Sequence, residues 1–386
     1  MTDFIDQYKN ELLNSVLPFW MRHSRDDEQG GFFSCLLRDG TVYDTDKFVW
    51  LQARQTGTFA MLYNRLEKRQ EWLEMARHGA RFLEKHGRDE QGNWYFALNR
   101  AGAPLVQPYN VFSDCFAALA FGELYKATGE KRYAEIARQT FQRVIQRRDN
   151  PKGKYNKAYP GTRELKNFAL PMILSHLALE LEDLLEEDLV QELTRDVIID
   201  VMDVFYQTEE QVVLENVTQK GGFSDSFDGR LLNPGHAIEA MWFVMDLGER
   251  MGDRGLIVQA AQRALRMIEY GWDEEYGGIF YFMDIKGYPP QQLEWDRKLW
   301  WVHLESLVAM LKGWRHTGEE DFRKWFERLH EYTWPRFTDA EHGEWFGYLN
   351  RRGERLFDLK GGKWKGCFHV PRALYYCWRE LELLEG

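Results

Sequence analysis

Asp27-Glu28-Gln29-Gly30-Gly31-Phe32-Phe33 is a polar turn followed by two aromatic residues, and the chain repeats this phrase. Clear copies return at 89–95, 273–280 and 339–346, and weaker ones lie at 219–223 and 151–155. A glycine-containing polar turn followed by aromatic residues predicts a short β-hairpin. The copies lie about sixty residues apart, a length that fits one helix pair plus its hairpin. Six such units fill the chain and predict a closed ring.

The segments between these hairpins carry apolar residues at helical spacing. Twelve segments show the pattern: 3–20, 45–67, 70–86, 110–128, 131–148, 164–183, 188–207, 234–251, 254–271, 296–316, 319–334 and 366–384. Each hairpin follows an odd-numbered segment and precedes an even-numbered one. Twelve helices in six pairs predict an all-α fold, an (α/α)6 barrel with short β-hairpins at one mouth. An open α-solenoid that binds a partner protein is the alternative.

The even-numbered helices decide where a site can lie. If they form the inner ring, their N-terminal ends meet at the mouth that carries the hairpins, and we expect the site there. The chain has 386 residues, which exceeds the usual size of one domain. Because the repeats are evenly spread and no Pro/Ser-rich linker separates them, residues 1–386 are expected to form a single barrel domain.

Charge and composition exclude several classes of function. The formal net charge is −11, so the basic surface that nucleic acids require is not expected. The N-terminal residues show neither a basic stretch nor a long apolar run, so we expect no signal peptide and no membrane anchor. The four cysteines lack metal-ligand spacing and are expected to be reduced thiols in a cytoplasmic protein. Some of the 15 tryptophans are expected to offer stacking surfaces to a sugar ring.

Four polar clusters fall near the N-terminal halves of even-numbered helices, and two of them pair a ring with a carboxylate. In Asn233-Pro234-Gly235-His236 the imidazole sits in the first turn, and Glu239 shares its face three residues on. A carboxylate beside an imidazole fixes its tautomer and raises its basicity. In the cluster 298–305, Trp301 and Glu305 are four residues apart and also share a face.

The other two clusters place His369 at the start of the last helix and Arg54 on an otherwise apolar helix face. Each residue alone also fits a structural role, such as a cap or an internal ion pair. Two histidines at one mouth favour acid/base chemistry over packing. They form no HxxxH or HExxH pair, so no metal site is expected. A glycoside hydrolase needs two opposed carboxylates, and Glu239, Glu305 and Asp225 keep that alternative open.

Four strings of sequence resemble a known family. They are Asn233-Pro234-Gly235-His236, Lys298-Leu299-Trp300-Trp301-Val302-His303, Cys367-Phe368-His369-Val370-Pro371-Arg372 and Tyr109-Asn110-Val111-Phe112-Ser113-Asp114. They resemble the N-acyl-D-glucosamine 2-epimerase (renin-binding protein) family, and the resemblance covers essentially the whole chain. It implies an (α/α)6 barrel and an isomerase that interconverts N-acetylglucosamine and N-acetylmannosamine. Relatives act on mannose or cellobiose as epimerases or aldose–ketose isomerases, and these substrates remain alternatives.

The resemblance also implies a mechanism and assigns residues to it. One histidine removes the C2 proton of the open-chain sugar to give a cis-enediolate, and the other returns a proton to the opposite face. His369 matches the family's base and His236 its acid partner, with exchanged roles in the reverse direction. Arg54 matches the residue that stabilises charge on the substrate oxygens. Glu239 and Glu305 would hold the imidazoles and sugar hydroxyls, and no metal or redox cofactor is required.

Substrate contacts follow from the same resemblance. Trp242 and Trp301 would pack on the sugar ring, and Tyr109 and Asn167 are further expected contacts. Disaccharide epimerases of this superfamily carry histidines in the sixth helix, whereas the stretch 167–172 has none. This departure favours an N-acylated monosaccharide over cellobiose and leaves free mannose open.

The resemblance further implies stimulation by ATP. The loop 151–163 is the one basic stretch of an acidic chain, and its cationic residues are expected to contact nucleotide phosphates as point charges. They are Lys152, Lys154, Lys157 and Arg163. The loop is not a Walker loop, and a solvated connector is an equally open alternative. The expected partners are therefore a small amino sugar and ATP, and a homodimer is left open.

Overall fold

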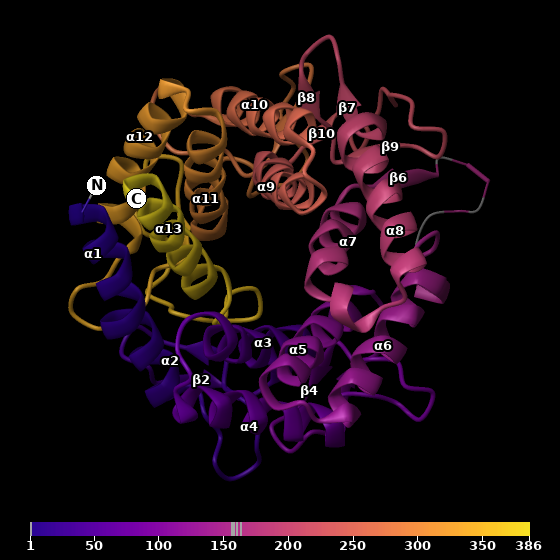
Figure 1. Cartoon of the computed structure of the whole chain (residues 1–386), viewed down its shortest axis with the longest axis vertical. Helices are drawn as coiled ribbons and strands as arrows, with labels where there is room; N and C mark the ends of the chain where they lie inside the picture. Colours follow the sequence, from indigo (N-terminus) through magenta and orange to yellow (C-terminus); the bar gives the residue numbers. More distant parts are fainter. Residues whose placement is uncertain (1, 156–158, 160, 163) are drawn as a thin grey trace.

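The computed structural model describes residues 2–155, 159, 161–162 and 164–386. Its helices form a ring, and successive helix pairs follow one another around it (Figure 1). The N- and C-terminal helices lie side by side, and Oγ1 of Thr2 donates a hydrogen bond of 2.5 Å to Oε1 of Glu385. The arrangement is the (α/α)6 barrel that the repeats predict.

One helix of each pair lies on the inside of the ring. The inner helices are α3 (Val49–Arg65), α5 (Phe112–Thr128), α7 (Ala169–Glu180), α9 (Pro234–Met251), α11 (Trp300–Thr317) and α13 (His369–Glu385). Most of their residues are buried on every face, as helices enclosed by neighbours must be. They are the even-numbered helices of the sequence pattern, so the predicted choice of inner ring is confirmed.

The outer helices are amphipathic and pack an apolar stripe against the inner ring. They are α1 (Thr2–Asn10) with α2 (Leu17–His23), α4 (Gln70–His86), α6 (Lys131–Gln146), α8 (Glu187–Ile199), α10 (Arg254–Gly271) and α12 (Glu320–Phe337). A π-helical turn, η1 (Glu11–Val16), joins α1 to α2, and a second, η4 (Asp200–Val204), follows α8. Two 3₁₀ turns, η2 (Gly153–Tyr155) and η3 (Glu182–Leu184), complete the helical elements of the described residues.

Contacts between the first and last repeats close the ring. Nη1 of Arg65 on α3 donates to the hydroxyl of Tyr376 on α13 at 2.9 Å. At the mouth, Nε of Arg38 donates to Oδ2 of Asp339 at 2.8 Å, joining the first hairpin to the sixth. An open solenoid has no such contacts between its ends, so that alternative is wrong.

The repeated turn carries an ion pair that links neighbouring hairpins. Asp26 caps the turn through the backbone N–H of Glu28 and Gln29, and its other oxygen accepts from buried Lys47 at 2.8 Å. Arg100, which comes from the next hairpin, also donates to Asp26 at 3.0 Å. The same trio recurs as Asp273 with Lys298 and Arg351, and as Asp339 with Lys360 and Arg38. These links tie the hairpins into a collar around the mouth.

Short antiparallel strands complete this collar. They are β1 (Cys35–Leu36), β2 (Val42–Asp44), β3 (Lys47–Phe48), β4 (Ala97–Leu98), β5 (Pro104–Val106), β6 (Leu165–Asn167), β7 (Tyr206–Gln207), β8 (Val212–Val213), β9 (Asn216–Thr218), β10 (Leu231–Leu232), β11 (Met283–Asp284), β12 (Lys298–Leu299) and β13 (Tyr348–Leu349). The sheets run β1-β2, β3-β4-β5, β6-β9, β7-β8, β10-β11 and β12-β13. Several pairs, such as β3 with β4, join one repeat to the next.

The third and fourth repeats depart from the predicted pattern. Residues 165–167 form β6 rather than the start of a helix, because they pair with β9 in the register Asn167↔Asn216. Residues 206–207 likewise form β7 and pair with β8. The degenerate copy at 151–155 is the 3₁₀ turn η2 rather than a hairpin. In this part of the chain, strand pairing overrides local helical spacing, between distant segments for β6 and between neighbouring ones for β7.

All four cysteines are buried as free thiols. Among the described residues, no helix combines the length and the apolar character needed to cross a membrane.

Candidate active site

His369 is the first residue of α13, and a carboxylate from the neighbouring inner helix holds its ring. Its Nδ1 lies 2.7 Å from Oε1 of Glu305 on α11. Since a carboxylate only accepts, Nδ1 carries the proton and Nε2 is left as the basic nitrogen. Burial, followed by the positive charge of Arg54, lowers the pKa of His369 well below its ordinary value. The imidazole is therefore a neutral base at neutral pH.

His236 lies in the first turn of α9, where its sequence predicts it. Asn233 caps the helix by accepting the backbone N–H of His236 at 3.1 Å. Nδ1 of His236 lies 3.0 Å from Oε2 of Glu215, a residue between β8 and β9. Burial lowers the pKa of His236, but the charge of Glu215 and its hydrogen bond outweigh burial and the pKa is raised. The sequence analysis assigned this carboxylate role to Glu239, which is wrong.

Trp301 brings the two histidines together. Its ring centroid lies 5.3 Å from that of His236 and 5.7 Å from that of His369. Gly235 allows this approach of α9 to α11, because a Cβ atom there would lie 2.7 Å from the indole. Both imidazoles therefore face one small region at the mouth of the ring.

Arg54 points its guanidinium into an aromatic surround on the same side. The group lies 4.4 Å from the ring centroid of Trp50, 3.9 Å from that of Phe116 and 4.5 Å from that of Phe368. No ion pair joins it to a carboxylate of the described residues, and its buried Nε finds no hydrogen-bond partner among them. Burial lowers the pKa of Arg54 to about 9. A half-buried cation with a buried, unpartnered Nε is suited to an oxygen that develops negative charge.

Arg372 completes the charge balance, and the sequence analysis did not assign it a role. It is buried on α13, where its Nη2 donates to Glu239 and, at 2.7 Å, to Oε1 of Glu305. Glu239, Glu305 and His369 present potential metal-ligand atoms within 4.8 Å of one another. The guanidinium already supplies a cation to both carboxylates, so this donor set does not favour a metal ion.

Trp242 does not lie where the sequence analysis placed it. Its side chain is completely buried, and its indole N–H donates to Oε2 of Glu305 at 3.0 Å. A fully enclosed ring has no face to offer a sugar, so the expected stacking role is wrong. Trp242 instead fixes the carboxylate that holds His369.

The expected contacts Asn167 and Tyr109 lie at the edge of the site. Nδ2 of Asn167, an exposed residue of β6, donates to Oε1 of Glu215 at 3.2 Å and to Oδ1 of Asn216 at 3.0 Å. Tyr109 is half-buried, and its ring lies 4.9 Å from that of Phe96. Asn167 thus touches His236 indirectly, through Glu215. A lone carboxylate after the apolar run 212–214 was the only sequence signal for Glu215.

The basic loop lies apart from these residues in the sequence and is only partly described. Lys152 and Lys154 are exposed, and Nζ of Lys154 lies 5.2 Å from the ring centroid of Tyr155. Lys157 and Arg163 lie outside the described residues.

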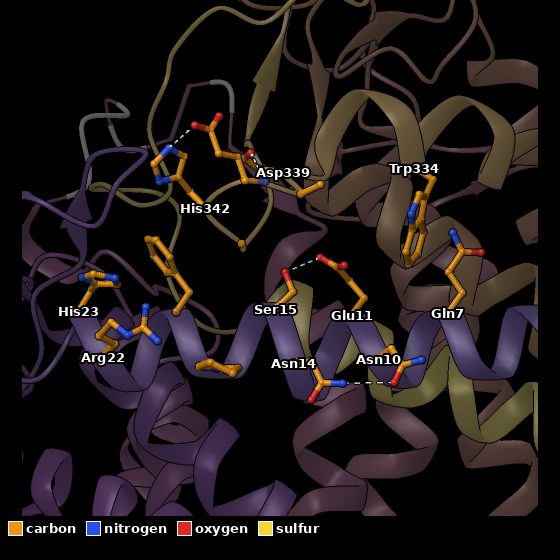
Figure 2. Close-up of a pocket in the computed structure, with 15 residues that line it drawn as sticks. Gln7, Asn10, Glu11, Asn14, Ser15, Arg22, His23, Trp334, Asp339 and His342 are labelled. Atoms are coloured by element: carbon orange, nitrogen blue, oxygen red, sulfur yellow. Dashed lines mark hydrogen bonds and ion pairs between the residues drawn. The ribbon is translucent and has the colours of Figure 1, made fainter.

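A pocket of about 530 Å³ lies away from the histidines, between the α1–α2 helix and the turn after α12 (Figure 2). Many of its polar side chains bond one another. Asn14 donates to Asn10, and Glu11 accepts from Ser15 and from Trp345. The pocket contains none of the predicted site residues.

Comparison with known proteins agrees with the predicted fold and family. The model of the N-acylglucosamine 2-epimerase (GlcNAc 2-epimerase) family matches residues 31–373. N-acylglucosamine 2-epimerase of Mus musculus is 42% identical over 377 residues, which cover 95% of this chain and 89% of that protein. Cellobiose 2-epimerase of Bacteroides fragilis is 27% identical over 396 residues, covering 95% and 96%.

Solved structures show the same architecture. The structure of cellobiose 2-epimerase from Bacillus thermoamylovorans aligns with a TM-score of 0.84 at 21% identity, over 99% of this chain and 100% of that one. Fold and relatives together define a sugar epimerase, an enzyme of the isomerase class. The chain belongs to the N-acylglucosamine 2-epimerase family.

Proposed function

We propose that the protein interconverts N-acetylglucosamine and N-acetylmannosamine by moving the proton at C2. The observation that carries the proposal is the pair His369 and His236, each bound through Nδ1 to a carboxylate and each packed on Trp301. Inversion of one carbon without a cofactor needs a base on one face and an acid on the other. Two imidazoles beside one indole can supply that base and that acid.

The chemistry begins with the open-chain aldehyde, in which the C2 proton is acidic because it lies beside the carbonyl. Nε2 of His369 takes that proton, and the bond electrons form a C1–C2 double bond and a negative O1. Arg54 stabilises the negative oxygen. Nε2 of His236 then donates its proton to the opposite face of C2, and the aldehyde returns with inverted configuration. General acid/base catalysis of this kind contributes roughly 10²–10⁴-fold per group.

The carboxylates do not favour the hydrolase alternative. Glu239 and Glu305 both accept from Nη2 of Arg372, so one guanidinium holds them together instead of leaving them on opposite sides of a cleft. Asp225 is exposed and paired with Arg230 at 2.8 Å and with Lys286 at 2.7 Å. A glycosidase requires one carboxyl group to hold a proton at working pH.

The substrate class is tested by initial rates with N-acetylmannosamine, mannose and cellobiose at equal concentration. The 42% identity to the mouse N-acylglucosamine enzyme, against 27% to the cellobiose enzyme, supports the N-acylated monosaccharide. We expect the highest kcat/KM with N-acetylmannosamine. Faster conversion of cellobiose or mannose would replace the proposed substrate while keeping the epimerase chemistry.

We also propose that ATP binds the basic loop and stabilises the barrel without joining the chemistry. The exposed side chains of Lys152 and Lys154 support this in a chain of net charge −11. A ligand that binds only the folded state adds about 2.7 kcal/mol at a hundredfold excess over its Kd. ATP should raise the melting temperature of the wild type and of Lys131→Ala, but not of the double variant Lys152→Ala/Lys154→Ala. If ATP does not change the melting temperature of the wild type, the proposal is wrong and the loop is a solvated connector.

Location and association stay predictions. Buried free thiols suit a reducing compartment, which supports the cytoplasm. A homodimer would appear in light scattering as twice the chain mass of 45.9 kDa.

A further inference from the structure

The two site histidines have carboxylate partners that differ in how their charge is balanced. Glu305, the partner of His369, also accepts from the guanidinium of Arg372 at 2.7 Å and from the indole of Trp242 at 3.0 Å. Glu215, the partner of His236, accepts from the neutral amide of Asn167 at 3.2 Å. No arginine or lysine of the described residues forms an ion pair with Glu215.

This difference matters because both carboxylates are buried. A buried carboxylate whose charge is shared with a guanidinium stabilises a neighbouring imidazolium only weakly. A buried carboxylate with neutral partners has no other cation, so it favours the imidazolium strongly. The side chain of Glu215 is only 8% exposed, which leaves little screening by solvent.

The other charged groups around the two rings also favour a protonated His236 over a protonated His369. His236 faces Glu239 of its own helix and Arg54 of α3, and the ring of Tyr281 lies 6.1 Å from that of Trp301, on which His236 packs. His369 faces both arginines, Arg54 and Arg372, together with Glu239, Glu305 and His236 itself. Two cations therefore balance the two carboxylates around His369, whereas Glu215 and Glu239 together outweigh the one cation that opposes a charge on His236.

We propose that Glu215 is a positioning residue that keeps His236 protonated in the resting enzyme, that Asn167 holds Glu215 for this task, and that Arg372 keeps His369 neutral. The resting enzyme is then set to take a proton with His369 and to give one with His236. This assignment of direction rests on the proposed function, but the two protonation states belong to the chain itself.

The proton balance has a consequence for turnover. After one conversion His369 holds the proton taken from C2, and His236 has lost the one it gave. The enzyme is then set for the reverse reaction, and it regains its resting state by losing a proton from His369 to water and gaining one at His236. One epimer is consequently the substrate of the resting form, and the other is the substrate of the form left by turnover.

The test reads both imidazoles by NMR in the ligand-free enzyme labelled with ¹⁵N-histidine. Signals are assigned by their loss in His236→Asn and His369→Asn. We expect His236 to be doubly protonated at neutral pH, and His369 to be neutral with its proton on Nδ1. In Glu215→Gln, which keeps the shape and removes the charge, the midpoint of the His236 titration should fall by more than one pH unit.

Matched variants separate this role from simple support of the fold. Glu210→Gln makes the same charge change on an exposed residue nearby and should leave the His236 titration unmoved. Asn167→Ala removes the amide that donates to Glu215, together with its contacts to Asn216 and to the backbone of Ala169, and it should shift the same midpoint by a smaller amount. In Glu215→Gln the loss of kcat/KM at high pH should begin more than one pH unit lower than in the wild type, matching the shift of His236.

The outcomes are distinct for the two proposals. A neutral His236 at neutral pH in the wild type, or an unmoved midpoint in folded Glu215→Gln and in Asn167→Ala, overturns the role of Glu215. A second outcome is a protonated His236 and a neutral His369 in an enzyme that turns over none of the tested sugars. That outcome would overturn the proposed function and leave the role of Glu215 intact.

Discussion

Nδ1 of His369 lies 2.7 Å from Oε1 of Glu305, so the first residue of α13 is bound to the second turn of α11. Trp242 and Arg372 hold that carboxylate from two other directions. The ring of His369 is thus fixed with Nε2 as its free nitrogen. A proton-abstracting base needs both a fixed direction and a neutral form, and this contact supports both.

Replacement of either histidine should abolish epimerisation and leave the barrel folded. We expect His369→Asn and His236→Asn each to lower kcat at least about 10²-fold, the lower end for loss of an acid or base. The control is His342→Ala, which replaces a histidine of the pocket in Figure 2 and should keep full activity. Near-normal turnover by either site variant, shown folded by its melting curve, would remove that histidine from the chemistry.

Arg54→Lys should be severely impaired although the charge is kept. The planar guanidinium fills the space between Trp50, Phe116 and Phe368 and can donate to two oxygens. An ammonium group cannot reproduce that geometry. We expect kcat/KM to fall at least about tenfold, equivalent to 1.4 kcal/mol of transition-state stabilisation. A value equal to that of the wild type would place Arg54 outside the site.

The collar around the mouth should depend on its buried lysines far more than on its exposed arginines. Lys47 and Asp26 are completely buried, whereas the side chain of Arg100 is 38% exposed. Lys47→Met leaves Asp26 buried without its main partner, and should lower the free energy of unfolding by about 3 kcal/mol. Arg100→Ala should cost about 1 kcal/mol or less. Urea unfolding measures both, and equal losses would contradict this ranking.

Stability should fall with rising pH because of Asp114. This carboxyl group is buried on α5, and burial raises its pKa to about 7. The unfolded value is about 4, so the folded state binds the extra proton between these values and loses that advantage as the pH rises through them. The loss is about 1.4 kcal/mol per pH unit within the window. Asp114→Asn should remove this slope, and urea unfolding at several pH values that shows equal slopes would refute the assignment.

The sequence predicts most of the fold because helix ends are marked locally. The expected helices 234–251 and 254–271 agree with α9 and α10 at both ends. Asn233 and Asp253 cap their N-termini, and Gly252 ends the first in a left-handed conformation at φ 70°. The error at 164–168 has the opposite cause, since the partner strand of β6 lies some fifty residues further on.

In the candidate site, too, local features were predictable from the sequence and contacts between distant residues were not. Placement near the N-terminal ends of inner helices predicts that His236, His369 and Arg54 lie close together, and in the structure the charges of Arg54 and His236 both act on His369. Pairing between side chains from different repeats was not predictable, so the role of Arg372 and the partner of His236 were missed. Trp242 was misassigned because the family resemblance does not tell which neighbour its side chain meets, and the indole is completely buried against Glu305.

The central claim is that the protein moves the C2 proton of an N-acylated amino sugar through exchange with water. The most direct test is to incubate the enzyme with N-acetylmannosamine in D2O and to follow C2 by proton NMR. The account predicts N-acetylglucosamine with deuterium at C2, because the proton taken by one histidine is replaced by one from the other. An unchanged sugar, or N-acetylglucosamine that keeps its original C2 hydrogen through many turnovers, would contradict it.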